Sequence, residues 1–187
     1  MKHVLSVALA LALCALTSCA SWHYRKTEDQ KTTFGRSGNS LSLAEGNVQV
    51  QFQVPAGWKI TSALDEPMDW DYAADAPNNK IGFGVMLAEQ KNSLTIPERQ
   101  QAYLNNVHQL YDPKVRMEKA GNVTLKDGRV IPTYRYTSAY WGERIVIIIQ
   151  EGDYATTFEF SNRDQKSLKG QEEAIQKVLG TYSAQKK

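Results

Sequence analysis

The chain has 187 residues, with 22 lysines and arginines against 20 aspartates and glutamates, so its formal net charge is only +2. This near-neutral balance excludes the basic stripe with which a nucleic-acid-binding domain attracts phosphates, so we expect no nucleic-acid partner. It also supplies no polybasic patch for a membrane surface. The length suits a single domain with a sizeable core.

Residues 1–18 have the composition of an export leader. A basic start at Lys2 precedes an apolar or small-residue run over 4–16, which is shorter than the about 20 residues of a membrane span. The run ends in Leu16-Thr17-Ser18-Cys19, which resembles the lipobox of bacterial lipoprotein signal peptides. An ordinary secretory signal, which would release a free protein, is the alternative, but the small-x-small sites near residue 17 are poor matches.

The lipobox resemblance implies that Cys19 is covalently modified with lipid. We expect cleavage before Cys19, a diacylglycerol on its nucleophilic sulfur and an acyl chain such as palmitate on its new N-terminus. No other cofactor is expected, and the lipid bilayer is the first partner. Ala20 follows, where lipoproteins kept at the inner membrane of enteric bacteria have Asp. The resemblance therefore implies the outer membrane, facing the periplasm, with the inner membrane or the cell surface as alternatives.

Residues 19–46 are polar and sustain no apolar period of 2 or 3.6. We therefore expect a lipidated N-terminus and a flexible tether over 19–46, followed by a single domain over 47–187.

The pattern of the domain is mostly that of strands. Apolar residues alternate with glutamines over 48–54, and a turn follows at Pro55-Ala56-Gly57-Trp58, from which Trp58 is expected to pack back onto the core. A loop is expected over 62–79 and a strand over 81–88, where Gly82 and Gly84 leave gaps that a neighbouring element fills. Further strands are expected over 114–125, 130–139, 144–150 and 154–160, with Asp127-Gly128 as a hairpin turn and 144–150 buried on both faces.

Two amphipathic helices are expected. The first covers about 95–112, with Pro97 in its first turn, and places His108 at its surface or boundary. The second covers about 168–182, with Leu168, Ile175, Val178, Leu179 and Tyr182 on its buried stripe and Gln171 facing water. Short hairpin links force antiparallel pairing, so the fold class is α+β, a twisted antiparallel sheet with amphipathic helices packed on it.

The first strand and its turn, Phe52-x-Val54-Pro55-x-Gly57-Trp58, resemble the opening of the Mog1/PsbP-like fold. The last strand and helix fit the same plan, and the resemblance covers about 47–183. The fold includes an extrinsic photosystem II protein, a nuclear import factor and lipoproteins of the DcrB type. The resemblance therefore implies docking on partners rather than catalysis.

An acidic loop with aromatic residues is the candidate site. Five acids lie within 65–75, and Asp69, Trp70, Asp71 and Tyr72 form its centre. Its acids and aromatics predict an anchor for a protein partner, a divalent-cation site, or a solvated loop whose Trp70 folds onto the core. Trp141, at a hairpin tip, is a further candidate for partner binding.

No catalytic residue and no metal ligand is assigned, because no nucleophile elbow, phosphate-binding loop or zinc-protease motif occurs. We expect a membrane-anchored periplasmic lipoprotein that acts without catalysis. It would bind a protein partner in the envelope as an accessory or assembly factor, or as an inhibitor or immunity protein. The alternative is a tethered module that binds a small molecule or a divalent cation.

Overall fold

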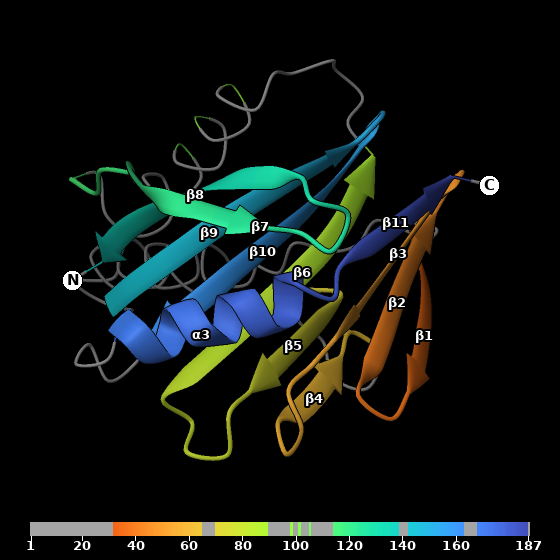
Figure 1. The fold of residues 1–187 in the computed structure, drawn as a ribbon, viewed down its shortest axis with the longest axis horizontal. Helices are drawn as coiled ribbons and strands as arrows, with labels where there is room; N and C mark the ends of the chain where they lie inside the picture. Colours follow the sequence, from red (N-terminus) through yellow and green to blue (C-terminus); the bar gives the residue numbers. More distant parts are fainter. Residues whose placement is uncertain are drawn as a thin grey trace, which may run out of the picture.

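The computed structural model describes residues 32–64, 70–89, 98, 101, 105, 114–138, 142–162 and 168–186. These residues form two antiparallel sheets and the helix α3, Leu168–Leu179 (Figure 1). The smaller sheet has the order β1-β2-β3-β11 and the larger has the order β4-β5-β6-β10-β9-β8-β7. The strands are β1 Thr33–Ser37, β2 Ser40–Glu45, β3 Val48–Gln53, β4 Lys59–Ser62, β5 Tyr72–Asp75, β6 Ile81–Glu89, β7 Glu118–Thr124, β8 Val130–Ser138, β9 Gly142–Glu151, β10 Tyr154–Asn162 and β11 Ser183–Lys186.

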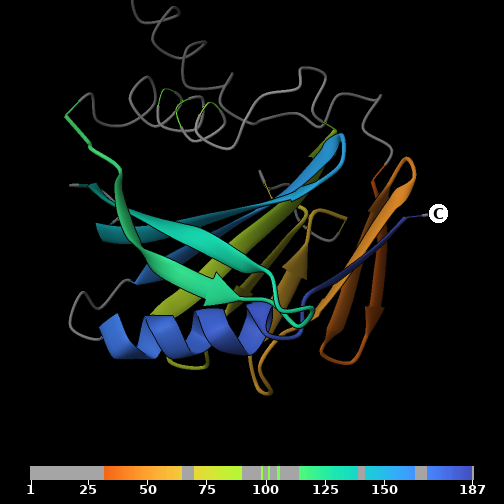
Figure 2. The same cartoon turned by 45° about the horizontal axis from the view of Figure 1, so that its top comes forward.

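The smaller sheet and α3 cover the same face of the larger sheet (Figure 2). Their shared core contains Leu43 from the smaller sheet, Phe83 and Phe158 from the larger, and Leu179 from α3, all buried. The ring centroids of Phe52 and Phe158 lie 5.2 Å apart in an edge-to-face arrangement, so an aromatic contact joins the two sheets. Because side chains alternate along each strand, the core residues lie on one face of the larger sheet, and their sequence neighbours lie on the opposite face.

Several expected elements are confirmed. The alternating segment forms β3, and the segment with Gly82 and Gly84 forms β6. β9 lies between β10 and β8, and its Ile145–Ile149 stretch is buried on both faces. Gly128 has a φ of 87°, as the turn between β7 and β8 requires. Trp58 packs back onto the core beside Phe83, with ring centroids 6.1 Å apart.

The expectation of a flexible tether up to residue 46 is wrong for its second half. β1 and β2 lie within it, and the side chains of Leu41 and Leu43 are 1% and 0% exposed. Two leucines spaced by two residues are enough to seat β2 on the core, because β3 supplies the neighbouring strand. The folded domain therefore begins before residue 47.

Two further expectations need correction. β5 lies inside the segment that was expected to be a loop over 62–79, because it pairs on both sides with β4 and β6. The statement that helices pack on the sheet is too strong, because the described part of the chain is mostly strand. Of the helix expected over 95–112, only residues 98, 101 and 105 are described, and these three are helical.

Candidate functional site

Trp70, the central aromatic residue of the predicted site, lies on the larger sheet. A Cβ atom built on Gly84 of β6 would stand 2.5 Å from Cγ and Cε2 of Trp70, closer than real Cβ atoms approach other atoms. Glycine at this position therefore makes room for the indole, and Trp70 fills the gap that the sequence predicted beside Gly84. Among the three hypotheses for the loop, this contact supports the one in which Trp70 folds onto the core.

Asp71 and Tyr72 are buried, with side chains 0% and 2% exposed. The Oδ2 atom of Asp71 accepts a 2.7 Å hydrogen bond from the backbone N–H of Leu87, and the Tyr72 hydroxyl donates to the carbonyl of Gly35 at 3.1 Å. The prediction that these two side chains are presented to a partner is wrong. They satisfy backbone groups of distant strands, as buried polar side chains usually do.

The remaining predicted site residues lie outside the described residues. They are Cys19, Asp69 and Trp141, so lipidation and partner binding at these positions stay predictions. Within the described ranges, no three His, Cys, Asp or Glu side chains gather closely enough to hold a metal ion. No helix in those ranges is long and apolar enough to cross a bilayer.

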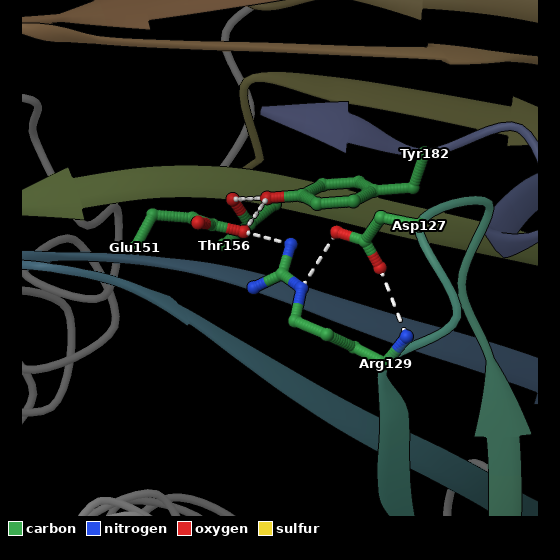
Figure 3. Close-up of polar contacts among 5 residues, drawn as sticks. All are labelled: Asp127, Arg129, Glu151, Thr156 and Tyr182. Atoms are coloured by element: carbon green, nitrogen blue, oxygen red, sulfur yellow. Dashed lines mark hydrogen bonds and ion pairs between the residues drawn. The ribbon is translucent and has the colours of Figure 1, made fainter. Parts of the chain in front are cut away.

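A polar network joins two hairpin turns to the segment that follows α3 (Figure 3). Arg129 donates from Nη2 to Oε1 of Glu151 at 2.7 Å and from Nε to Oδ2 of Asp127 at 2.7 Å. The Tyr182 hydroxyl donates to the same Glu151 oxygen at 3.3 Å and lies 3.0 Å from the Thr156 hydroxyl. One carboxylate thus connects the β7–β8 turn, the β9–β10 hairpin and the residue that precedes β11.

The charges and hydrogen bonds of this network stabilise the fold. The backbone N–H of Arg129 donates to Asp127 and, with the guanidinium, holds the pKa of that carboxyl below its usual value. Burial raises the pKa of Tyr182 and keeps its hydroxyl protonated, so it remains a donor. The groups therefore satisfy one another within the protein.

A second polar cluster lies on the opposite face of the larger sheet. Glu159 in β10 is 9% exposed, accepts a 3.1 Å hydrogen bond from the Tyr136 hydroxyl, and has Oε1 3.4 Å from Nη1 of Arg144. Burial raises the pKa of Glu159 to about 8, although the Arg144 guanidinium favours the charged form. A carboxyl of this kind titrates near neutral pH, and the alternation of β10 gave no sign of its burial.

A groove of about 290 Å³ lies between α3 and strands β7, β8 and β9. β7 has a bulge between Lys119 and Gly121, and the small residues Ala120 and Gly121 line the groove there. The lining combines apolar side chains with polar ones, chiefly Val123, Ile145 and Ile175 with Arg135, Gln171 and Glu172.

Gln171 is the most unusual residue of the groove. It is 0% exposed, so the prediction that it faces water is wrong. Its Nε2 donates to the carbonyl of Phe160 at 3.2 Å, which fixes the amide orientation because an amide oxygen could not donate there. Its Oε1 is buried and accepts no hydrogen bond from the described residues. A buried acceptor left in this state costs about 1–3 kcal/mol.

Other buried polar atoms with unmade hydrogen bonds lie on the same face of the sheet. Arg135 lines the groove, and its Nη1 is 3.7 Å from Oε2 of Glu143, which is a loose pair. Nε of Arg135 and Oε1 of Glu143 have no hydrogen-bond partner among the described residues. The same holds for both amide atoms of Asn162, which is 0% exposed and opposes Glu143 in the sheet. Several buried polar atoms without hydrogen-bond partners among the described residues therefore lie near the N-terminal end of α3.

The fold is similar to that of cyanobacterial PsbP (CyanoP) from Synechocystis sp. PCC 6803, known from its solution structure. The match has a TM-score of 0.53 and 11% sequence identity, and covers 80% of this chain and 95% of that chain. No protein-family model matches the sequence, and neither does any curated protein. Identity this low demonstrates a shared fold alone. The expected PsbP-like arrangement of antiparallel sheets is thereby confirmed.

Proposed function

We propose that the protein is a non-catalytic binding protein of the cell envelope, held at the periplasmic face of the outer membrane by lipid on Cys19. The observation that carries the binding role is the groove beside α3. Its lining combines apolar side chains, chiefly Val123, Ile145 and Ile175, with the polar side chains of Arg135 and Glu172. Small-molecule sites typically have this composition, a mostly apolar lining with a few polar groups that orient the ligand.

The lipobox that ends at Cys19 supports the location. More than one acyl chain makes a stable anchor where a single chain is marginal. β1 begins at Thr33, and the segment from Cys19 to Thr33 reaches at most roughly 50 Å at 3.3–3.6 Å per residue. The domain would therefore sample its ligand close to the membrane surface.

Two forms of the proposal differ in the partner. A protein partner would make the chain an accessory or assembly factor, or an inhibitor or immunity protein, and the PsbP-like fold is compatible with that role. The groove favours a small ligand, because about 290 Å³ is near the lower end of small-molecule pockets. A standard protein interface instead buries about 800 Å² on each partner.

The anchor is tested by Cys19→Ala in cells that are fed radiolabelled palmitate. The label should disappear from the protein, and the protein should leave the outer-membrane fraction. Cys14→Ala is the matched control, because it removes the leader's other thiol and should leave labelling unchanged. Full labelling of Cys19→Ala would overturn the proposed anchor.

A further inference from the structure

We infer that one end of the domain docks on the headgroups of an anionic bilayer, as a membrane contact separate from the lipid on Cys19. The surface consists of three turns, which we call the basic tip. These are the connections β1–β2, β3–β4 and β5–β6, at residues 36–40, 54–59 and 76–80. The inference goes beyond the proposed function, which assigns a ligand groove and a lipid anchor but no protein surface that faces the membrane.

The three turns meet at one end of the domain, which is the lower end in Figure 1. The backbone N–H of Val54 donates to the carbonyl of Asn39 at 2.8 Å, so the β3–β4 turn lies against the β1–β2 turn. A Cβ atom built on Gly57 would stand 3.7 Å from Cγ of Pro77, so the β5–β6 turn lies against the β3–β4 turn. The three turns therefore form one continuous surface.

The basic tip gathers cations that are far apart in the sequence. Each turn contributes one exposed cation, and these are Arg36, Lys59 and Lys80. The side chain of Arg36 lies over its own turn, because its Nε donates to the carbonyl of Gly38 at 3.2 Å. The three turns contain no acidic residue. Asp75 immediately precedes the third turn, and its carboxylate lies over β6. Cations therefore predominate on this surface.

The opposite end of the domain is acidic, so the charge changes sign along the strands. A Cβ atom built on Gly46 would overlap the hydroxyl of Tyr154, so the β2–β3 turn lies against the start of β10. Glu45, Glu89 and Asp153 lie close to the same hydroxyl. Burial raises the pKa of Tyr154, and the three carboxylates raise it further. An anionic bilayer would attract the basic tip and repel this end, so the contact would have one orientation.

The proposed anchor favours a bilayer over an acidic protein as the partner. β1 starts at Thr33, where the anchored segment would join the domain, and its five residues span roughly 17 Å to the basic tip. A tether that reaches at most roughly 50 Å therefore lets the basic tip touch the bilayer. Three cations make a weak contact by themselves, since each strengthens binding to an anionic bilayer roughly fivefold. A tethered domain needs no more, because the anchor keeps its concentration at the membrane high.

The test measures how the full chain with Cys19→Ala, which carries no lipid, binds vesicles of two compositions. One is phosphatidylcholine alone, and the other is phosphatidylcholine with an equal amount of phosphatidylglycerol. The neutral vesicles measure what the apolar leader contributes. We expect binding to the anionic vesicles to be at least about tenfold tighter. This difference should vanish at an ionic strength of about 1 M, where the Debye length is about 3 Å. Equal binding to both compositions at low ionic strength would overturn the inference.

Two triple variants remove the same charge from different places, and all six residues are exposed, so Tm should change little. The tip variant combines Arg36→Gln, Lys59→Gln and Lys80→Gln. The matched control changes lysines outside the three turns and combines Lys119→Gln, Lys126→Gln and Lys177→Gln. The tip variant should bind anionic vesicles at least about tenfold more weakly than the control. Equal binding by the two variants would show that net charge attracts the chain, and would contradict the proposed surface.

Amide hydrogen exchange of the same protein shows which end faces the bilayer. On anionic vesicles, exchange should slow at residues 54–59 and 76–80 and should stay unchanged at 45–47, on the acidic end. Slowing at 45–47 without slowing at the basic tip would overturn the inference. Failure of these tests would leave the proposed anchor standing, because palmitate labelling of Cys19 tests the anchor separately.

Discussion

The contact between Trp70 and Gly84 gives the sharpest prediction about the fold. Gly84 lies in the extended strand β6, so alanine brings no backbone strain, and its Cβ conflicts with the indole of Trp70. Overpacking of this kind costs about 1–3 kcal/mol. Gly84→Ala should therefore lower Tm by roughly 2–10 °C in a domain of this size. Trp70→Ala removes the ring, and in that background Gly84→Ala should be neutral or slightly stabilising.

Urea denaturation of the wild type, both single variants and the double variant measures this coupling. We expect a coupling free energy of about 1–3 kcal/mol between the two positions. Gly121→Ala is the matched control, because its Cβ meets only ordinary contact at 3.7 Å and should show no coupling to Trp70. If Gly84→Ala costs the same with and without the indole, Trp70 does not pack on Gly84. That result would favour the hypothesis that Trp70 anchors a partner.

Two further substitutions test the polar clusters. Burial raises the pKa of Glu159 from 4.5 to about 8. The resulting contribution to the free energy of unfolding is fully present below pH 4.5 and is lost as the pH rises through about 8. Relative to the wild type, the free energy of unfolding of Glu159→Gln, measured by urea denaturation, should rise by up to about 1.4 kcal/mol per pH unit between pH 5 and 8. A Gln variant that is less stable than the wild type at pH 8 would show that the charged pair with Arg144 dominates. Tyr182→Phe removes a hydroxyl that contacts Thr156 and Glu151 and should cost about 1–2 kcal/mol at pH 7. Tyr154→Phe, outside that network, should cost less, and equal costs would contradict the stabilising role of the network.

Strong periodic patterns explain which elements the sequence could predict. β3 alternates apolar residues with glutamines, and the Ile145–Ile149 stretch of β9 has no polar residue at all. Each pattern specifies both the strand and the number of buried faces without any knowledge of its neighbours. The turn at Gly128 was predictable for a similar reason, because its backbone conformation is one that few residues other than glycine adopt.

Weakly apolar strands could not be predicted from their own residues. β1 has Phe34 as its only large apolar side chain, and β2 has Leu41 and Leu43 among serines. β2 forms because β3 offers it a neighbour, and β1 forms because β2 does, so the stability of these strands comes from their pairing rather than from the segments themselves. The alternation of Leu41 and Leu43 between glycines at 38 and 46 was the available signal, and a tether was nevertheless expected.

The candidate site depended even more on contacts that are distant in the sequence. Asp71 looked exposed among other acids, but its carboxylate caps the N–H of Leu87 in a neighbouring strand. Gln171 fell on the polar side of the predicted helix, but it lies against the end of β10. A helical period shows the direction of a side chain but does not show whether a strand lies in that direction. The groove joins residues from three strands and a helix, so no local motif could announce it.

The pairing of β3 with β11 has a consequence for the order in which the chain can fold. The backbone N–H of Gln53 donates to the hydroxyl of Thr181, 128 positions later, and β11 then pairs with β3. While a chain emerges from its N-terminal end, β3 has to wait for β11 before the smaller sheet can close. The export proposed for this chain would suit this order, because the fold could not close around β3 before nearly the whole polypeptide had been translocated.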